Sequence, residues 1–184
     1  MFLYNNYEAV TINSIIQATG LTKGGIYYYY ASKEEIFKAV VDKYMIENHA
    51  DTSVEYQSLK ELIQYTIDFT KGKITRMVIE NKDAQHEIPI NYLSLMVTAF
   101  RYFPDYAKIG NAFLKTQSDK WEKALKKAVI KNEIRNDIDI PAMVANIMQI
   151  NSGIVGNMLM GGSMIYALDM FERQYWELYK LIKR

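Results

Sequence analysis

Residues 11–37 read TINSIIQATGLTKGGIYYYYASKEEIF, and this stretch decides the fold. Thr11 is a good N-cap for a first helix, and Gly20 suits the left-handed residue that ends such a helix. Thr22 can cap a short second helix that runs to about Tyr30. The sequence therefore predicts two helices joined by a tight turn at Gly20.

A third helix is expected to begin directly after the second. Ser32 and Glu35 have the spacing of a capping box, in which each side chain bonds the backbone N–H of the other residue. Phe37 and Val40 then lie on the apolar face of the helix that follows. Three helices are therefore expected within residues 11–47.

The second of these helices has the features of a recognition helix in a helix-turn-helix. In that motif the second helix enters the major groove of DNA, and the first lies across it. Leu21 and Ile26 are expected to be apolar anchors facing the first helix, and Tyr30 is expected in the core. Gly24 and Gly25 disfavour a helix but let the backbone come close to a groove wall.

The tyrosines between these anchors are candidates for direct contact with DNA. Tyr27, Tyr28 and Tyr29 project in three directions, since successive helical residues point about 100° apart. Each offers a ring to thymine methyl groups and a hydroxyl to phosphates or base edges. Four consecutive residues cannot all face inward, so at least two of residues 27–30 should be exposed.

Composition restricts the class of protein but does not itself indicate DNA. The net charge of the chain is +1, and residues 1–46 carry as many acidic as basic side chains. Cysteine is absent, which excludes disulfides and thiol catalysis and fits a cytoplasmic protein. The sequence shows no membrane span, signal peptide, nucleophile elbow or phosphate-binding loop. We therefore expect neither an enzyme nor a membrane protein.

The rest of the chain also has helical periodicity, and no alternation typical of strands. Long helices are expected over residues 58–81, 90–102, 106–131, 139–160 and 163–183. The expected architecture is all-α, with a three-helix helix-turn-helix domain over residues 1–47. A helical ligand-binding and dimerisation domain is expected over residues 48–184.

The motif of residues 11–37 resembles the DNA-binding signature of the TetR/AcrR transcriptional regulators. The shared elements are the threonine that opens the first helix, the Gly20-Leu21-Thr22 turn, the Gly-x-Ile-Tyr-x-Tyr pattern and the Lys-Glu-Glu-Ile-Phe start of the next helix. Tyr30 stands where phenylalanine is usual. The resemblance implies base contacts from Lys23, Gly24, Gly25, Tyr27 and Tyr28. It implies phosphate contacts from Thr11, Thr22, Tyr29 and Lys33.

The start of the chain departs from that family. Members normally carry a further helix, preceded by a basic tail, and residues 2–7 correspond to the end of that helix. The first helix is thus expected to be truncated or lacking, which leaves an alternative function open. In that alternative the chain is a helical dimer that binds ligand and has lost DNA binding through its shortened N-terminus.

Methionines and aromatic residues of the middle helices are candidates for a ligand cavity, because methionine adapts to varied shapes. Ordinary core packing is the alternative for each of them. The cavity candidates are Phe69, Met77, Tyr92, Met96, Phe100, Phe113, Trp121 and Met148. His49 and His86 lack the spacing of metal ligands and are expected at the surface, so we expect neither a metal nor another cofactor.

The last two helices are apolar almost all round, which requires burial on more than one side. A homodimer in which they pack against the same helices of a second copy would provide it, although burial within one monomer is the alternative. The interface candidates are Met143, Ile147, Ile154, Met158, Leu168, Phe171, Tyr175 and Trp176. A symmetric dimer also matches a palindromic double-stranded DNA operator. The resulting hypothesis is a repressor that a small apolar or amphipathic effector releases from its operator.

Overall fold

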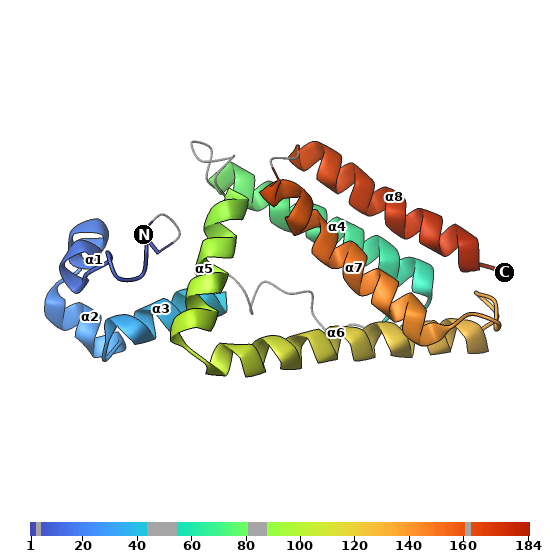
Figure 1. Cartoon of the computed structure of the whole chain (residues 1–184), viewed down its shortest axis with the longest axis horizontal. Helices are drawn as coiled ribbons and strands as arrows, with labels where there is room; N and C mark the ends of the chain where they lie inside the picture. The colour runs from blue at the N-terminus through green and yellow to red at the C-terminus, as the bar shows by residue number, and fades with distance from the viewer. Residues whose placement is uncertain (3–4, 44–54, 81–87, 161–162) are drawn as a thin grey trace. The chain divides into compact units, whose positions relative to one another are not determined.

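A computed structural model describes residues 1–2, 5–43, 55–80, 88–160 and 163–184 of the chain. Within these ranges the side chains of residues 77–80, 88–90, 92 and 158–159 lie outside the description. The described residues form eight α-helices, with one isolated bridge between Ile134 and Lys183. The predicted all-α class is confirmed (Figure 1). In the described part of the chain, no helix has the length and apolar character that crossing a membrane needs.

Two compact units divide the chain, and the first contains the helix-turn-helix stretch. It comprises Met1–His49 and Ile90–Lys108. Its helices are α1 (Ile12–Thr19), α2 (Lys23–Tyr29), α3 (Lys33–Val41), nearly all of α5 (Ile88–Tyr102) and the start of α6 (Asp105–Ile130). Its buried core is made of Phe2, Val10, Ile15, Ile26, Phe37, Val41, Leu95, Ala99, Phe103 and Tyr106. Residues of α5 thus share a core with α1–α3, whereas the sequence-based boundary at residue 47 assigns α5 to the second domain.

The helix ends of the first unit follow local sequence signals. Thr11 caps α1, and Gly20 ends it in the left-handed conformation with φ of 70°, as predicted. Ser32 accepts a hydrogen bond from the backbone N–H of Glu35 at 3.2 Å. The predicted return bond to Ser32 is not made, because the Glu35 carboxylate accepts from the backbone N–H of Ala31 at 2.7 Å. The Glu35 side chain therefore binds the backbone N–H of Ala31 instead of that of Ser32.

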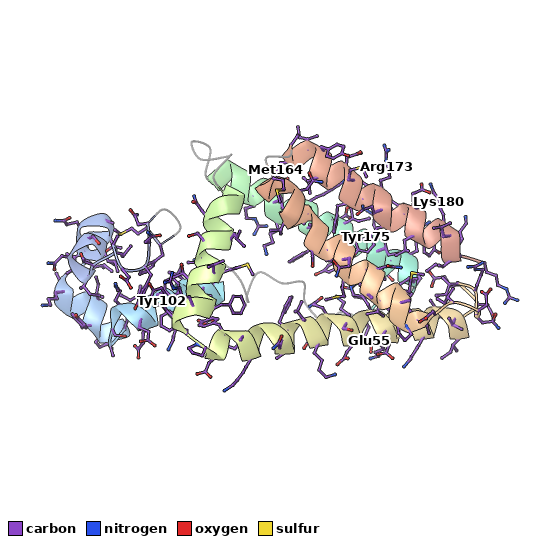
Figure 2. The ribbon with its side chains drawn as sticks, viewed as in Figure 1. Glu55, Tyr102, Met164, Arg173, Tyr175 and Lys180 are labelled. Carbon is purple, nitrogen blue, oxygen red and sulfur yellow. The ribbon has the colours of Figure 1, made fainter. Side chains whose placement is uncertain are left out.

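The second unit comprises Ala50–Pro89 and Ile109–Arg184. It contains α4 (Leu59–Glu80), most of α6, α7 (Ile140–Leu159) and α8 (Met164–Ile182), and Ser163 caps α8 as predicted. In Figure 1, α8 lies alongside α7 and α4. Tyr175 of α8 is fully buried, stacks on Trp121 and donates a hydrogen bond to Asn151 of α7 at 2.7 Å (Figure 2). Burial raises the pKa of Tyr175, so its hydroxyl stays protonated and able to donate.

One carboxylate joins three distant parts of the second unit. Glu133, in the loop after α6, accepts from the backbone N–H groups of Leu59 and Lys60 at 2.9 Å each. It also accepts from the hydroxyl of Tyr179 on α8 at 3.2 Å. We call this set the Glu133 clasp. An acidic side chain here satisfies orphan amides at the start of α4 and interacts favourably with the helix dipole.

The Glu133 clasp predicts a stability effect. Glu133→Gln is expected to lower the free energy of unfolding by about 1–3 kcal/mol, because the neutral amide replaces one acceptor oxygen with a donor facing other donors. Urea denaturation followed by circular dichroism measures this change. The matched control is Glu122→Gln, which removes an exposed i,i+4 pair with Lys126 and should change the free energy by under about 0.5 kcal/mol. Equal effects of the two substitutions would contradict the clasp.

Candidate nucleic-acid interface

Helix α2 is held against α1 by a single buried side chain. Ile26 is almost completely buried in the core that also contains Ile15 of α1. The other predicted anchor is wrong, because Leu21 is 51% exposed. Leu21 lies in the turn between Gly20, which ends α1, and Thr22, which caps α2. Neither helix therefore directs the side chain of Leu21 into the core. The orientation of α2 therefore depends on Ile26.

Tyrosine side chains cover the outward surface of α2. Tyr27 is 44% exposed, Tyr28 is 81% exposed and Tyr29 is 74% exposed. The rings of Tyr28 and Tyr29 meet edge to face, with centroids 4.9 Å apart. With Ile26 buried, these three exposed rings form much of the solvent-facing surface of α2. The prediction that at least two residues of the run are exposed is confirmed.

The expectation of a core position for Tyr30 is wrong, because that side chain is 36% exposed. Tyr30 is the C-cap of α2, with an extended backbone at φ −137° and ψ 119°. The helical periodicity that would have aimed its ring inward ends one residue earlier. All four tyrosines of the run are thus exposed.

The two glycines of α2 differ in what surrounds them. A Cβ added at Gly24 would meet no described atom within 4 Å, whereas one at Gly25 would lie 3.2 Å from the Thr22 hydroxyl oxygen. That hydroxyl accepts from the backbone N–H of Gly25 at 3.0 Å and so caps the helix. Packing within the described residues thus leaves room for a side chain at Gly24, and the capping contact crowds Gly25.

The predicted phosphate-contacting residues lie around α2, but one of them already has partners. Thr11, Thr22 and Tyr29 are exposed, as is the base-contact candidate Lys23. The ammonium of Lys33 donates to the backbone carbonyl of Tyr7 at 2.8 Å and lies 4.2 Å from the centre of that tyrosine's ring. A phosphate contact from Lys33 would require the ammonium to leave Tyr7.

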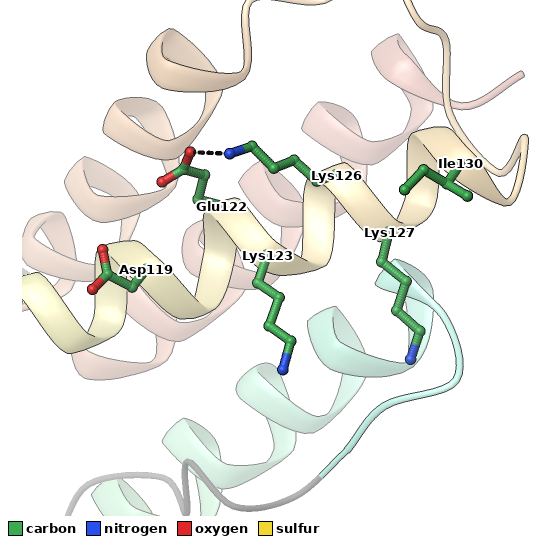
Figure 3. Close-up of a pocket in the computed structure, with 6 residues that line it drawn as sticks. All are labelled: Asp119, Glu122, Lys123, Lys126, Lys127 and Ile130. Carbon is green, nitrogen blue, oxygen red and sulfur yellow. Dashed lines mark ion pairs between the residues drawn. The ribbon is translucent and has the colours of Figure 1, made fainter.

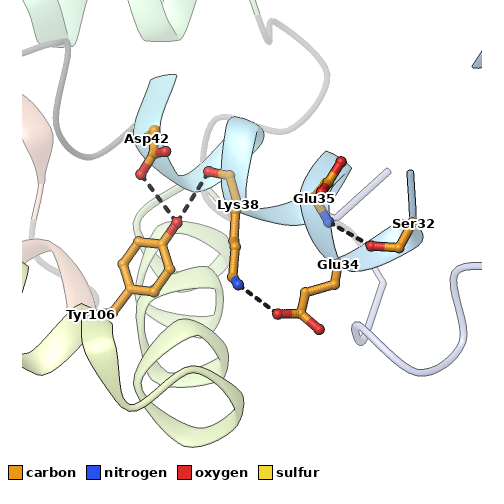
Figure 4. A network of polar contacts seen from close by, with 6 residues as sticks. All are labelled: Ser32, Glu34, Glu35, Lys38, Asp42 and Tyr106. Carbon is orange, nitrogen blue, oxygen red and sulfur yellow. Dashed lines mark hydrogen bonds and ion pairs between the residues drawn. The ribbon is translucent and has the colours of Figure 1, made fainter. Parts of the chain in front are cut away.

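Sequence reasoning missed the polar contacts that fix α3 (Figure 4). The buried Tyr106 donates to the carboxylate of Asp42 at 3.0 Å and lies 3.2 Å from the carbonyl of Lys38. Burial, together with the hydrogen bond to Asp42, raises the pKa of Tyr106, which keeps its hydroxyl protonated. Lys38 also pairs with Glu34 one turn earlier. The i,i+4 spacing of Glu34 and Lys38 is a local sequence signal for that ion pair. No such signal indicates that Tyr106 pairs with Asp42, because the two residues lie 64 positions apart.

The predicted cavity residues are spread over both units. Met96 and the exposed Phe100 belong to the first unit, whereas Phe69, Phe113, Trp121 and Met148 belong to the second. Trp121 is a core residue with 2% exposure, and the side chains of Met77 and Tyr92 lie outside the described residues. The cavity as a whole stays a prediction.

Two of the surface hollows in the second unit have linings without a predicted cavity residue. One of about 530 Å³ lies on α6 between Asp119 and Ile130 and is bordered by lysine side chains (Figure 3). The other, of about 470 Å³, lies between α7 and α8 and includes Gly153 and Leu181.

Residues 1–40 match the family model described as bacterial regulatory proteins, tetR family. The match covers α1, α2 and most of α3, the helices that carry the tyrosine surface. This N-terminal stretch is therefore similar to the TetR family.

Other comparisons extend the likeness along the chain. The chain is 23% identical over 165 residues to the uncharacterized HTH-type transcriptional regulator YfiR of Bacillus subtilis (strain 168), which is 86% of this chain and 75% of that protein. The TetR-family transcriptional regulator from Cytophaga hutchinsonii has 16% sequence identity and a TM-score of 0.63, over 99% of this chain and 88% of that chain. TylP, a TetR regulator from Streptomyces fradiae, has 17% identity and a TM-score of 0.51, over 100% of this chain and 81% of that chain. These two structures share the fold.

The predicted interface residues fall into two groups. Met143, Leu168 and Trp176 are half-buried, and the side chain of Met158 lies outside the described residues. Four others pack in the core of the chain itself, so they have almost no surface to offer a partner: Ile147, Ile154, Phe171 and Tyr175. Periodicity marked these positions as apolar but could not tell which side of α7 and α8 faces the rest of the chain.

Sequence reasoning also missed the apolar side chains that α7 and α8 leave uncovered. They are Val155 of α7, Ile165, Tyr166 and Leu181 of α8, and Met160 directly after α7. On the same helices, charged pairs such as Arg173 with Asp169 and Lys180 with Glu177 occupy other exposed positions (Figure 2). Exposed apolar side chains of this size are candidates for a protein–protein contact.

Proposed function

We propose that this chain is a ligand-responsive repressor that binds a palindromic operator as a homodimer in the cytoplasm. In the proposal α2 enters the major groove, with Lys23, Gly24, Gly25, Tyr27 and Tyr28 at base edges. Phosphates are bound by Thr11, Thr22, Tyr29 and Lys33. A small apolar or amphipathic effector binds the second unit. The effector then favours a dimer conformation in which the two α2 helices no longer fit successive grooves.

The observation that carries the proposal is the tyrosine surface of α2. Tyr27, Tyr28 and Tyr29 are exposed on a helix that Ile26 anchors from behind. Exposed large apolar rings cost solvation free energy, and a run of three is unusual unless another molecule covers them. The open space at Gly24 supports the same reading, because a groove wall could approach the backbone there. The similarity of residues 1–40 to the TetR family supplies the class of partner, a DNA duplex.

A binding experiment tests the proposal directly. The chain is titrated against fluorescently labelled duplexes from the DNA that flanks its own gene, with a scrambled duplex as the comparison, and anisotropy is recorded. One flanking duplex is expected to bind more tightly than the scrambled one. Its affinity should fall steeply as salt increases, because phosphate contacts release counterions. Equal binding of all duplexes by a dimeric chain would reject the repressor and favour the ligand-binding dimer without DNA binding.

The homodimer gives a second prediction. Leu181 is exposed on α8 and lines the hollow between α7 and α8. Leu181→Asp is expected to weaken dimerisation roughly a hundredfold, since two-fold symmetry places the unfavourable carboxylate at the interface twice. Sedimentation velocity over a range of concentrations measures the shift from dimer to monomer.

A matched substitution distinguishes a specific interface from a general loss of apolar surface. Leu114 is similarly exposed but lies on α6. Leu114→Asp should leave the dimer dissociation constant unchanged. A dimer that withstands Leu181→Asp, or that Leu114→Asp weakens equally, would place the interface elsewhere.

A further inference from the structure

Lys73 on α4 differs from the other partly buried lysines of the described chain. Six lysines in the described ranges are half-buried, and five have a hydrogen bond, an ion pair or an aromatic ring as a partner: Lys33, Lys38, Lys71, Lys120 and Lys127. Among the described residues, Lys73 has no such contact. Its ammonium is therefore partly removed from water without compensation.

The contrast with Lys71, two residues away on the same helix, shows what is missing. Lys71 forms an ion pair with Glu172 of α8. Lys73 points in another direction around the helix. Burial lowers its pKa, and no carboxylate of the described residues opposes that effect. Burying an unpaired cation destabilises a protein, so a lysine at this place needs a reason other than folding.

Aromatic rings precede Lys73 on the same side of α4. Tyr65, Phe69 and Lys73 follow one another at four-residue intervals, which aligns them along one helix face. The rings of Tyr65 and Phe69 are stacked, with centroids 5.9 Å apart and planes at 25°. Both side chains are half-buried, and neither belongs to the residues that pack against the described core. From Tyr65 to Lys73 the face spans about 12 Å and carries two aromatic rings followed by one positive charge.

We propose that this face binds an amphipathic carboxylate, with its head group on the ammonium of Lys73 and its apolar body along Phe69 and Tyr65. The inference rests on the proposed function, of which it specifies the effector class. A single negative charge matches the single ammonium at this end. A dianionic phosphate would need further donors, and the next one along the face, Lys120, lies beside Tyr65 at the other end. An extended aliphatic chain of about ten carbons has the length of the face.

Decanoate and decanol are the probes that test the head group on the unaltered protein. They share chain length and differ in charge, so isothermal titration of the full chain without DNA measures the contribution of the carboxylate. Decanoate is expected to bind at least about tenfold more tightly than decanol, because a charge-assisted hydrogen bond replaces solvent at Lys73. Absence of decanoate binding, or equal binding of the two probes, would overturn the proposal.

Lys73→Met tests the residue. This variant should weaken decanoate binding about tenfold or more and leave decanol binding nearly unchanged. Its ligand-free Tm should rise by about 2–4 °C, because an unpaired buried charge is removed. A decrease in Tm would show that the ammonium already has a partner, and this too would overturn the proposal. Lys73→Arg should retain decanoate binding.

The control is Lys123→Met, which removes an exposed lysine of α6. It should change neither decanoate binding nor Tm, and an effect equal to that of Lys73→Met would overturn the site. Because these titrations contain no DNA, they separate the two proposals. A chain that binds decanoate through Lys73 but no operator refutes only the repressor. A chain that binds its operator but not decanoate refutes only the carboxylate site.

Discussion

Tyr27→Ala is expected to abolish the preference of the protein for its operator over other DNA. A side chain that reads a base edge contributes about 1–3 kcal/mol to discrimination. A symmetric dimer loses that contribution twice, so operator affinity should fall on the order of a hundredfold or more. Fluorescence anisotropy with operator and scrambled duplexes measures both affinities. Weak binding to the scrambled duplex should persist, since phosphate contacts from other residues remain.

Two further measurements separate a lost contact from a lost fold. Tyr27 is exposed while its neighbour Ile26 holds α2 in place, so the Tm of Tyr27→Ala should stay close to that of the unaltered chain. Tyr27→Phe keeps the ring and removes the hydroxyl, and should retain whatever part of the affinity comes from thymine methyl contacts. Unchanged operator binding by Tyr27→Ala would show that α2 does not read DNA.

Trp121→Ala is expected to have the largest effect on stability, lowering the free energy of unfolding by about 3–5 kcal/mol. The indole is 2% exposed and stacks on Tyr175 with ring centroids 5.6 Å apart, so truncation leaves a void beside a buried tyrosine. Because native proteins are stabilised by only about 5–15 kcal/mol, this loss would be visible as a large shift in the urea midpoint.

The same substitution distinguishes core from cavity for Trp121. If the side chain lined an open cavity, alanine would merely enlarge existing space, and the ligand-free protein would lose little stability. Trp121→Phe provides a graded control, because it keeps an aromatic ring against Tyr175 and should cost clearly less than alanine. If Trp121→Ala lowers the free energy of unfolding by less than about 1 kcal/mol, Trp121 lines a cavity and is not packed in the core.

Signals contained in short stretches of sequence predicted the helix ends well. Thr11, Gly20 and Ser163 act through their own backbone geometry and bonds within four residues, so their neighbours determine the outcome. The exposed tyrosines of α2 also followed from helical geometry. The prediction failed for Tyr30, because the helix ends one residue before it.

Long-range partners were not predictable in the same way. Lys33 bonds a carbonyl 26 residues earlier, and Glu133 bonds amides more than 70 residues earlier, where no spacing rule connects the pairs. Apolar periodicity placed Tyr175 and Phe171 on a buried face of α8. Periodicity could not distinguish whether a second copy or the chain itself buries that face. The bond from Tyr175 to Asn151 and its stacking on Trp121 show that the chain itself does so.

The backbone of residues 182–184 is hydrogen-bonded to the loop that contains Glu133, and the Glu133 side chain binds the start of α4. The backbone N–H of Arg184 donates to the carbonyl of Glu133 at 3.1 Å, and that of Arg135 donates to the carbonyl of Ile182 at 2.8 Å. A reporter or affinity tag joined directly to Arg184 would strain these two bonds and, through Glu133, the first turn of α4. A fusion made at Arg184 needs a flexible spacer, or it will alter the unit that it is meant to report on.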